Sequence, residues 1–185
     1  MPPQYNVPPG YDPQKDKIEI VEYDPNWPIL YLREEALLRQ ALHAAPQLAI
    51  EHFGSTSIQG LAAKPIIDIM ISVVTRDYWA HLIEPIKGLG YAFWDENPKK
   101  DEMFFVKGML PFGKRRTHHV HVYDFQGLRW KKELAFRGYL RSHPEVAQRY
   151  EILKRELAAK FTFDREAYTE AKTEFIQNIA KQIPD

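Results

Sequence analysis

A single carboxylate interrupts the most apolar stretch of this 185-residue chain. Asp68 lies in the run KPIIDIMI at residues 64–71, whose β-branched residues predict a strand covered on both faces. A buried carboxylate is costly unless it is protonated, hydrogen-bonded or bound to a cation. Asp68 is therefore a candidate ligand of a divalent cation. The alternative is a structural role in which backbone or hydroxyl groups satisfy it.

A turn rich in glycine and hydroxyl residues precedes this strand. It consists of Gly54, Ser55, Thr56 and Ser57 and follows another predicted strand. Backbone N–H groups of such a turn, with a helix N-terminus behind them, can bind an anion such as phosphate. An ordinary turn with hydroxyl caps is the alternative. The order strand, turn, short helix and acid-bearing strand is similar to the way nucleotidyltransferases place a phosphate-binding turn opposite a metal. The two segments together favour a functional site.

A second strand that could do chemistry is rich in histidine, with the sequence THHVHV at residues 117–122. Side chains alternate along a strand, so His119 and His121 are expected on one face, about 7 Å apart, with His118 on the other. Two such imidazoles can bind a metal, accept a proton or hydrogen-bond a phosphate. A hydrogen-bonded pair inside a half-buried sheet is the alternative.

Two basic residues are candidates for neutralising phosphate charge. Lys64 stands directly before the apolar strand, and Arg137 is flanked by large apolar residues that would orient it. Guanidinium groups suit bidentate phosphate binding, although most basic side chains are simply solvated. The sequence predicts phosphate contacts for both.

The composition limits the classes of protein to which the chain can belong. Basic and acidic residues number 25 each, so the zero net charge argues against a whole-protein electrostatic grip on nucleic acid. The absence of cysteine excludes disulfides, thiolate zinc sites and a cysteine nucleophile. No apolar run has the length of a membrane span, and the N-terminus lacks a signal-peptide pattern. We therefore expect a cytoplasmic protein that does not cross a membrane.

The hydrophobic pattern predicts a helix first and strands in the middle of the chain. Asp24 is expected to cap a helix over residues 27–45, and a helix over 77–89 should kink or split at Pro85. A short apolar run at 18–21 is a further strand or a docking segment. The main predicted strands span residues 48–53, 65–73, 91–94, 103–106 and 118–123.

The last third of the chain is expected to be helical. The segment Ser142 to Glu145 has the form of a capping box that starts one helix, and Asp164 can cap a final one. Residues 1–16 contain five prolines and almost no aliphatic side chains, which predicts a flexible arm before one domain over residues 17–185. The predicted fold class is α+β, with a mixed β-sheet, flanking helices and a C-terminal helical pair.

Residues 51–70, with the sequence EHFGSTSIQGLAAKPIIDIM, resemble the signature block of the GrpB family. Four further segments resemble other blocks of that family: residues 23–28, 117–122, 136–144 and 168–176. The resemblance therefore covers about residues 18–181. The resemblance implies a nucleotidyltransferase fold. Active nucleotidyltransferases usually carry two acids, spaced acid-x-acid, on the central strand. Met70 stands at the second position, as is usual in this family, and cannot bind a hard cation.

The resemblance implies a nucleotide-binding protein, and beyond that a metal-dependent nucleotidyl or phosphoryl transferase acting on a small molecule. Asp68, His119 and His121 would hold Mg²⁺ or Mn²⁺, and Glu51 or His121 would act beside Asp68 in place of the missing acid. The triphosphate would be bound by Gly54, Ser55, Thr56, Ser57, Lys64 and Arg137. We expect Asp68, the turn and the two histidines to line one cavity.

A second function follows from the same resemblance. In some bacteria a similar domain is fused behind dephospho-coenzyme A kinase. Together with Met70, this favours a catalytically degenerate module that binds a nucleotide or coenzyme A and regulates a partner enzyme.

Overall fold

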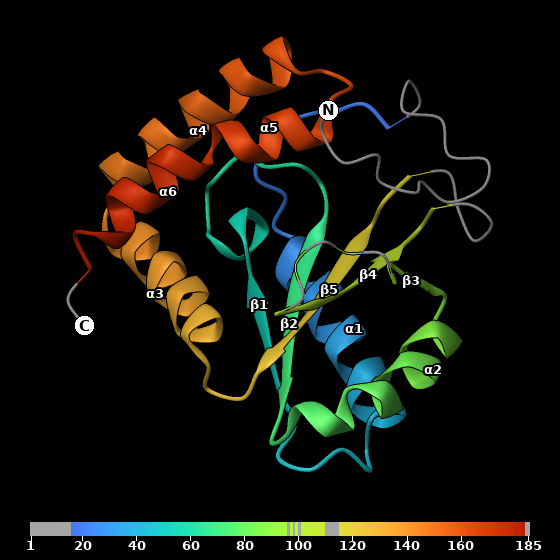
Figure 1. Cartoon of the computed structure of the whole chain (residues 1–185). Helices are drawn as coiled ribbons and strands as arrows, with labels where there is room; N and C mark the ends of the chain where they lie inside the picture. The colour runs from blue at the N-terminus through green and yellow to red at the C-terminus, as the bar shows by residue number, and fades with distance from the viewer. Residues whose placement is uncertain (1–15, 96, 98, 100, 110–114, 184–185) are drawn as a thin grey trace.

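The computed structural model describes residues 16–95, 97, 99, 101–109 and 115–183, and a five-stranded sheet forms its centre (Figure 1). The strands lie in the order β1-β2-β5-β4-β3. Their bounds are β1 Ala49–Phe53, β2 Ile67–Val73, β3 Tyr91–Phe93, β4 Met103–Lys107 and β5 His118–Asp124. The β2–β5 pair is parallel and the other three pairs are antiparallel. The predicted mixed α+β architecture is thereby confirmed.

One face of the sheet is apolar and is covered by two helices. α1 (Trp27–Ala41) and α2 (Ala80–Gly88) pack on it, against alternate isoleucines of β2 that include Ile67 and Ile69. Burial of each isoleucine contributes roughly 1.5–3 kcal/mol, so this face fixes the register of β2. Because side chains alternate along a strand, Asp68 points to the opposite face.

The opposite face meets the C-terminal helices, which gather on the other side of the sheet in Figure 1. α3 (Leu128–Ser142) contacts β1 and β5, and its Trp130 packs with Met70 and Phe53. Three further helices continue this layer: α4 (Pro144–Lys160), α5 (Arg165–Ala171) and α6 (Thr173–Ala180). The face that carries Asp68 is therefore bordered by helices from the last third of the chain.

The helix caps differ in part from the prediction. Asn26 and not Asp24 stands at the N-cap position of α1, without a capping hydrogen bond from its side chain, and the carboxylate of Asp24 accepts a hydrogen bond from the backbone N–H of Asn26. The predicted capping box is wrong, because Ser142 is the last residue of α3 and His143 precedes α4. Asp164 is confirmed as the cap of α5, since its carboxylate accepts a backbone N–H of the first turn at 3.0 Å.

Two other elements depart from the hydrophobic pattern, and a third follows one of its two predicted alternatives. Pro85 lies inside α2 without splitting it, and the residues before α2 form a short 3-10 turn, η3 (Arg76–Tyr78). The predicted final helix is interrupted at Lys172, so α5 and α6 are separate helices. The first apolar run of the chain is a docking segment, which forms an isolated bridge between Val21 and Ala63.

The predicted arm over residues 1–16 lies outside the described residues apart from Asp16. This residue is buried, and its carboxylate accepts hydrogen bonds from Arg116 Nε at 3.0 Å and Arg165 Nη2 at 2.5 Å. The packed part of the chain therefore includes Asp16. Within the part of the chain that the structure describes, no helix combines the length and apolar character needed to cross a membrane.

Candidate metal and phosphate site

Gly54 brings the glycine-serine turn against the carboxylate of Asp68. β1 and β2 are antiparallel, with Phe53 opposite Asp68, and Gly54 follows directly after β1. The φ of Gly54 is +67°, a left-handed value that residues with a Cβ rarely adopt. A Cβ at this position would lie 2.5 Å from Asp68 Oδ2. Both the backbone conformation and the close approach therefore require glycine.

The fold uses most of the hydroxyl groups of the turn. After Gly54 the chain forms the 3-10 turn η2 (Ser55–Ser57). Ser57 Oγ donates to the carbonyl of Gly54 at 2.7 Å, and the buried Thr56 donates to the carbonyl of Ile66 at 3.2 Å. A helical turn leaves its first backbone N–H groups without internal acceptors. Any anion here would thus meet mainly the backbone after Gly54, while Thr56 has a structural role.

β5 places two histidines beside Asp68. β2 and β5 run parallel, with Asp68 opposite His119 and Met70 opposite His121. His119 Nδ1 lies 3.0 Å from Asp68 Oδ1, and the candidate ligand atoms of Asp68, His119 and His121 all lie within 4.8 Å of one another. The prediction that His119 and His121 share a face is confirmed, and His118 points toward α1 on the other face.

Burial and hydrogen bonding set the charges of this pair. Burial opposes ionisation of Asp68, but the hydrogen bond from His119 and nearby charges hold the pKa of Asp68 below its ordinary value. Burial lowers the pKa of His119 to about 4, although Asp68 favours its protonated form. At neutral pH a neutral imidazole therefore donates its Nδ1–H to a carboxylate. The lone pair remains on His119 Nε2, which is buried and has no hydrogen-bond partner among the described residues.

This donor set fits a transition metal. An imidazole that donates one N–H to a carboxylate and keeps a lone pair on its other nitrogen is prepared as a metal ligand. The group offers one carboxylate, Asp68, and two imidazoles, His119 and His121. Mg²⁺ prefers oxygen ligands in octahedral geometry, whereas imidazole nitrogen suits zinc and other transition metals. Of the two cations that the family resemblance implies, Mn²⁺ suits these residues better than Mg²⁺.

Glu102 is a site residue that the sequence reasoning missed. Its Oε2 lies 3.7 Å from His121 Nδ1, and within the described residues both atoms are buried without a hydrogen-bond partner. Burial opposes ionisation of Glu102, but His121 and its other neighbours lower the pKa of Glu102 to about 2. The available signal was alternation: Glu102 stands two positions before Phe104, which pairs with His121, so both acid and histidine belong to one face.

Glu51 and Arg137 pair with each other and not with the metal donors. Arg137 Nη1 donates to Glu51 Oε2 at 2.9 Å and also to the carbonyl of His52. One turn later on α3, Arg141 Nη2 donates to the carbonyl of Ser57 at 2.7 Å. These contacts hold α3 against the end of β1 and the turn. Glu51 lies outside the donor group of Asp68, His119 and His121 found in the described residues.

Lys64 is the other predicted phosphate-binding residue. Its Nζ lies 5.0 Å from the ring centroid of Tyr168 in α5, and it is not part of the turn. Its positive charge nevertheless acts on Asp68, where it favours the ionised carboxylate. Lys64 therefore faces the same region as Asp68 from the side of the C-terminal helices.

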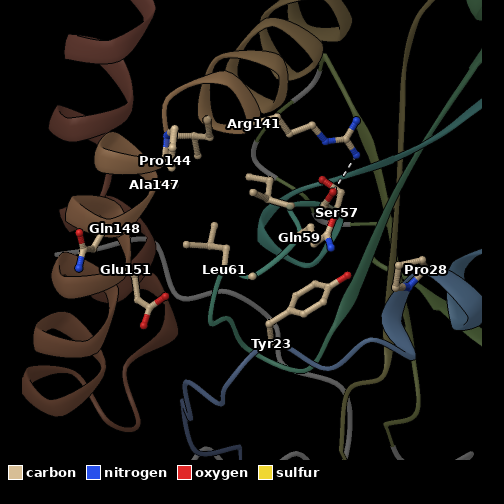
Figure 2. Close-up of a pocket in the computed structure, with 13 residues that line it drawn as sticks. Tyr23, Pro28, Ser57, Gln59, Leu61, Arg141, Pro144, Ala147, Gln148 and Glu151 are labelled. Carbon is tan, nitrogen blue, oxygen red and sulfur yellow. Dashed lines mark hydrogen bonds between the residues drawn. The ribbon is translucent and has the colours of Figure 1, made fainter.

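The far end of the turn borders a cavity of about 840 Å³ (Figure 2). Leu61 and Leu140 form apolar parts of its wall, and Tyr23 and Gln59 supply polar groups. Figure 2 shows Arg141 at its edge, bound to the carbonyl of Ser57. Neither Asp68 nor the two histidines line this cavity, so it does not unite the predicted site residues.

The fold defines a class. The mixed five-stranded sheet with flanking helices is a nucleotidyltransferase-like fold. The chain resembles the Cid1 poly(U) polymerase solved with Mg and 3′-dATP bound, with a TM-score of 0.52, 12% sequence identity, and coverage of 86% of this chain and 50% of that one. At this identity the likeness shows the fold alone.

Within that class, the chain belongs to the GrpB family, because the family model described as GrpB protein matches residues 17–182. The crystal structure of GrpB from Enterococcus faecalis is similar, with a TM-score of 0.78, 34% identity, and coverage of 89% of this chain and 96% of that one. UPF0157 protein PA4798 of Pseudomonas aeruginosa is 46% identical over 178 residues, which cover 93% of this chain and 72% of that protein. A dephospho-CoA kinase of Mycolicibacterium paratuberculosis is 26% identical over 192 residues, and this chain spans 46% of its length.

Proposed function

We propose that this protein binds a nucleotide at the sheet face that carries Asp68, with a divalent cation held by Asp68, His119 and His121. The observation that supports this most directly is the contact of Gly54 with Asp68, which puts a phosphate-type turn against a carboxylate already bonded to His119. When bound, the cation would supply positive charge opposite phosphate oxygens.

The side chains around this group have separate roles in the proposal. The backbone after Gly54 and the ammonium group of Lys64 contribute to phosphate binding. Glu51 and Arg137 neutralise each other, so their role is to hold the end of β1 and the turn in position. Glu51 and His121 both lie opposite Met70, at the place of the missing acid, and His121 is the one that belongs to the donor group.

Transfer of a nucleotidyl or phosphoryl group to a small molecule is the finer form of this proposal. The alternative is a regulatory module that binds a nucleotide or coenzyme A without turnover. Met70 favours the alternative, because its fully buried thioether stands where a second carboxylate would be needed for a second hard cation. The similarity to a dephospho-CoA kinase supports coenzyme A derivatives as ligands to be tested. A cytoplasmic setting stays a prediction from the sequence.

Thermal unfolding of wild type and Asp68→Asn tests the binding proposal. ATP, UTP and coenzyme A are each added with EDTA, Mg²⁺, Mn²⁺ or Zn²⁺. A ligand at 100 times its Kd stabilises the folded state by about 2.7 kcal/mol, which is readily measured. We expect stabilisation by a nucleotide with Mn²⁺, and loss of this effect in Asp68→Asn with little change in the stability of the empty protein.

Asp124→Asn is the matched control, because Asp124 lies at the end of β5 in an exposed ion pair with Arg76. It should keep the Mn²⁺-dependent effect. Nucleotide stabilisation that is equal in EDTA and unchanged in Asp68→Asn would end the metal-site proposal. Transfer itself is tested by incubating labelled nucleotide with the protein and analysing for a new labelled product and released pyrophosphate or nucleoside diphosphate.

A further inference from the structure

Two lysines lie over the buried ring of Tyr168 in α5, and an arginine stands on the same helix. The Nζ atoms of Lys64 and Lys172 lie 5.0 Å and 4.4 Å from the centroid of this ring. Arg165 stands one turn before Tyr168 on the same helix. We call Lys64, Arg165 and Lys172 the Tyr168 basic cluster. Lys64 precedes β2, whereas Arg165 and Lys172 lie at the two ends of α5, so the packing of α5 beside β2 brings Lys64 to the other two.

The N–H donors of this cluster are largely unfilled. Within the part of the chain that the structure describes, Lys64 and Lys172 form no hydrogen bond and no ion pair. Arg165 donates from Nη2 to Asp16, but its Nε and Nη1 are buried and have no acceptor among the described residues. Buried donors without acceptors destabilise a fold, so the two Arg165 donors beside two half-buried lysines, unpaired within the described residues, point to a ligand that supplies the acceptors.

The electrostatics of the cluster point the same way. Burial, together with the nearby charge of Arg165, lowers the pKa of Lys172 to about 8. Burial also lowers the pKa of Lys64, and the positive charges of Lys172 and Arg165 add to this effect. The three cationic groups are therefore close enough that each one disfavours the protonated form of the lysines. A bound anion would favour the protonated form again.

The position of the cluster indicates the size of the anion. The charge of Asp68 acts on both Lys64 and Lys172, so the cluster and the proposed cation site face one region. One phosphate has too few acceptor oxygens to fill the donors of two lysines and an arginine and also to reach the cation. A chain of linked phosphates carries acceptor oxygens on each unit and extends far enough to do both.

We propose that the Tyr168 basic cluster binds the polyphosphate end of a phosphorylated ligand, through Lys64, Arg165 and Lys172. This inference rests on the proposed function in one respect: the rest of the ligand is taken to extend from the cluster toward the proposed cation site at Asp68. The anion contact itself requires no metal.

Calorimetric titration with inorganic tripolyphosphate in EDTA at low salt tests the inference on the full-length protein. We expect Lys172→Gln and Lys64→Gln each to bind tripolyphosphate at least tenfold more weakly than wild type. Lys160→Gln is the matched control, because Lys160 also lies over an aromatic ring, Phe161 at 5.1 Å, but is exposed. It should bind within twofold of wild type.

The melting temperature separates loss of binding from loss of folding. Lys172→Gln removes an unpaired cation from a crowded cluster, so its melting temperature should equal or exceed that of wild type. Equal tripolyphosphate binding by wild type, Lys172→Gln and Lys160→Gln would overturn the inference. Binding of an oligonucleotide without any binding of tripolyphosphate would also overturn it, because the ligand would then be a nucleic acid backbone.

The failure of this inference can be told from failure of the proposed function. Tripolyphosphate binding that depends on Lys172 in EDTA, without any Mn²⁺-dependent nucleotide effect, supports the anion site and removes the metal site. A Mn²⁺-dependent nucleotide effect that is lost in Asp68→Asn but unchanged in Lys172→Gln supports the metal site and removes the anion site. Tighter binding of ATP than of tripolyphosphate identifies a nucleotide as the source of the phosphates, and equal binding identifies a free polyphosphate; both support the cluster as the anion site.

Discussion

The backbone of Gly54 lies against the carboxylate of Asp68 so closely that a Cβ at position 54 would be 2.5 Å from Asp68 Oδ2. The turn and the acid are consequently one structural unit, because any side chain at position 54 would displace the carboxylate of Asp68. The hydrogen bond from His119 holds the other carboxylate oxygen at 3.0 Å. Asp68 is thus fixed from two sides, by β1 and by β5.

The first prediction is that Gly54→Ala destabilises the protein and weakens metal binding. The substitution adds a Cβ both at a positive φ and against Asp68 Oδ2, and we expect a loss of about 2–4 kcal/mol of unfolding free energy in urea. Gly60→Ala is the control, because Gly60 has φ +79° but no atom within 4 Å of the position that a Cβ would take. It should lose about 1 kcal/mol and keep its Mn²⁺ affinity. Equal effects at both positions would contradict the importance of the Asp68 contact.

The second prediction concerns Glu102 as the residue that orients His121. Partners of a metal-binding histidine typically contribute about 10–100-fold to metal affinity. Glu102→Gln keeps the size of the side chain but removes the charge beside His121 Nδ1, so Mn²⁺ affinity measured by calorimetry should fall within that range. Glu84→Gln, in an exposed pair with Lys87, should have no effect. A destabilised Glu102→Gln protein with unchanged Mn²⁺ affinity would assign Glu102 a purely structural role.

The third prediction is a rise of stability with pH that depends on Lys154. This side chain is 2% exposed, and burial lowers its pKa from 10.5 to about 7. Between these two values the unfolded chain binds the proton more strongly than the folded protein, so the unfolding free energy rises with pH. One such group gives a slope of at most about 1.4 kcal/mol per pH unit. Urea unfolding at pH 7, 8 and 9 measures it.

Lys154→Met should flatten this profile, because the group that releases its proton on folding is gone. Lys131→Met, at an exposed position of α3, should leave the slope as in wild type. Lys172 adds a smaller rise above pH 8, since burial lowers its pKa to about 8. A wild-type profile that is flat or falls between pH 7 and 9 would contradict the prediction.

The fourth prediction separates the positioning role of Arg137 from a direct phosphate contact. Arg137→Gln removes the charged donor to Glu51 and to the carbonyl of His52. We expect a loss of about 1–2 kcal/mol of unfolding free energy, discounted for the partly exposed Glu51. Nucleotide affinity should change less than threefold, and Arg149→Gln at an exposed position of α4 should change neither quantity. A large loss of nucleotide affinity at unchanged stability would instead return Arg137 to the phosphate-binding group.

Part of the candidate site could be predicted from the sequence because it depends on local rules. Alternation along a strand is set by the backbone, so His119 and His121 had to share a face, and Asp68 had to point away from the isoleucines beside it. A glycine before three hydroxyl residues indicates a tight turn for an equally local reason. The helix caps were harder to predict, and Ser142 shows why: its hydroxyl also satisfies carbonyls of the helix that ends there.

The tertiary structure alone decided which of these residues meet. Strand order is set by the burial of surfaces far apart in sequence, and it is the insertion of β5 beside β2 that puts His119 opposite Asp68. The pairing of β4 with β5 brings Glu102 close to His121. The docking of α3 allows Arg137 to form an ion pair with Glu51. Charge partners of this kind carry no periodicity in the chain, because their separation in sequence reflects only the path between the elements. The sequence alone therefore established which residue types the site contains and which strand face each one occupies. The packing of the elements determined which residues contact one another.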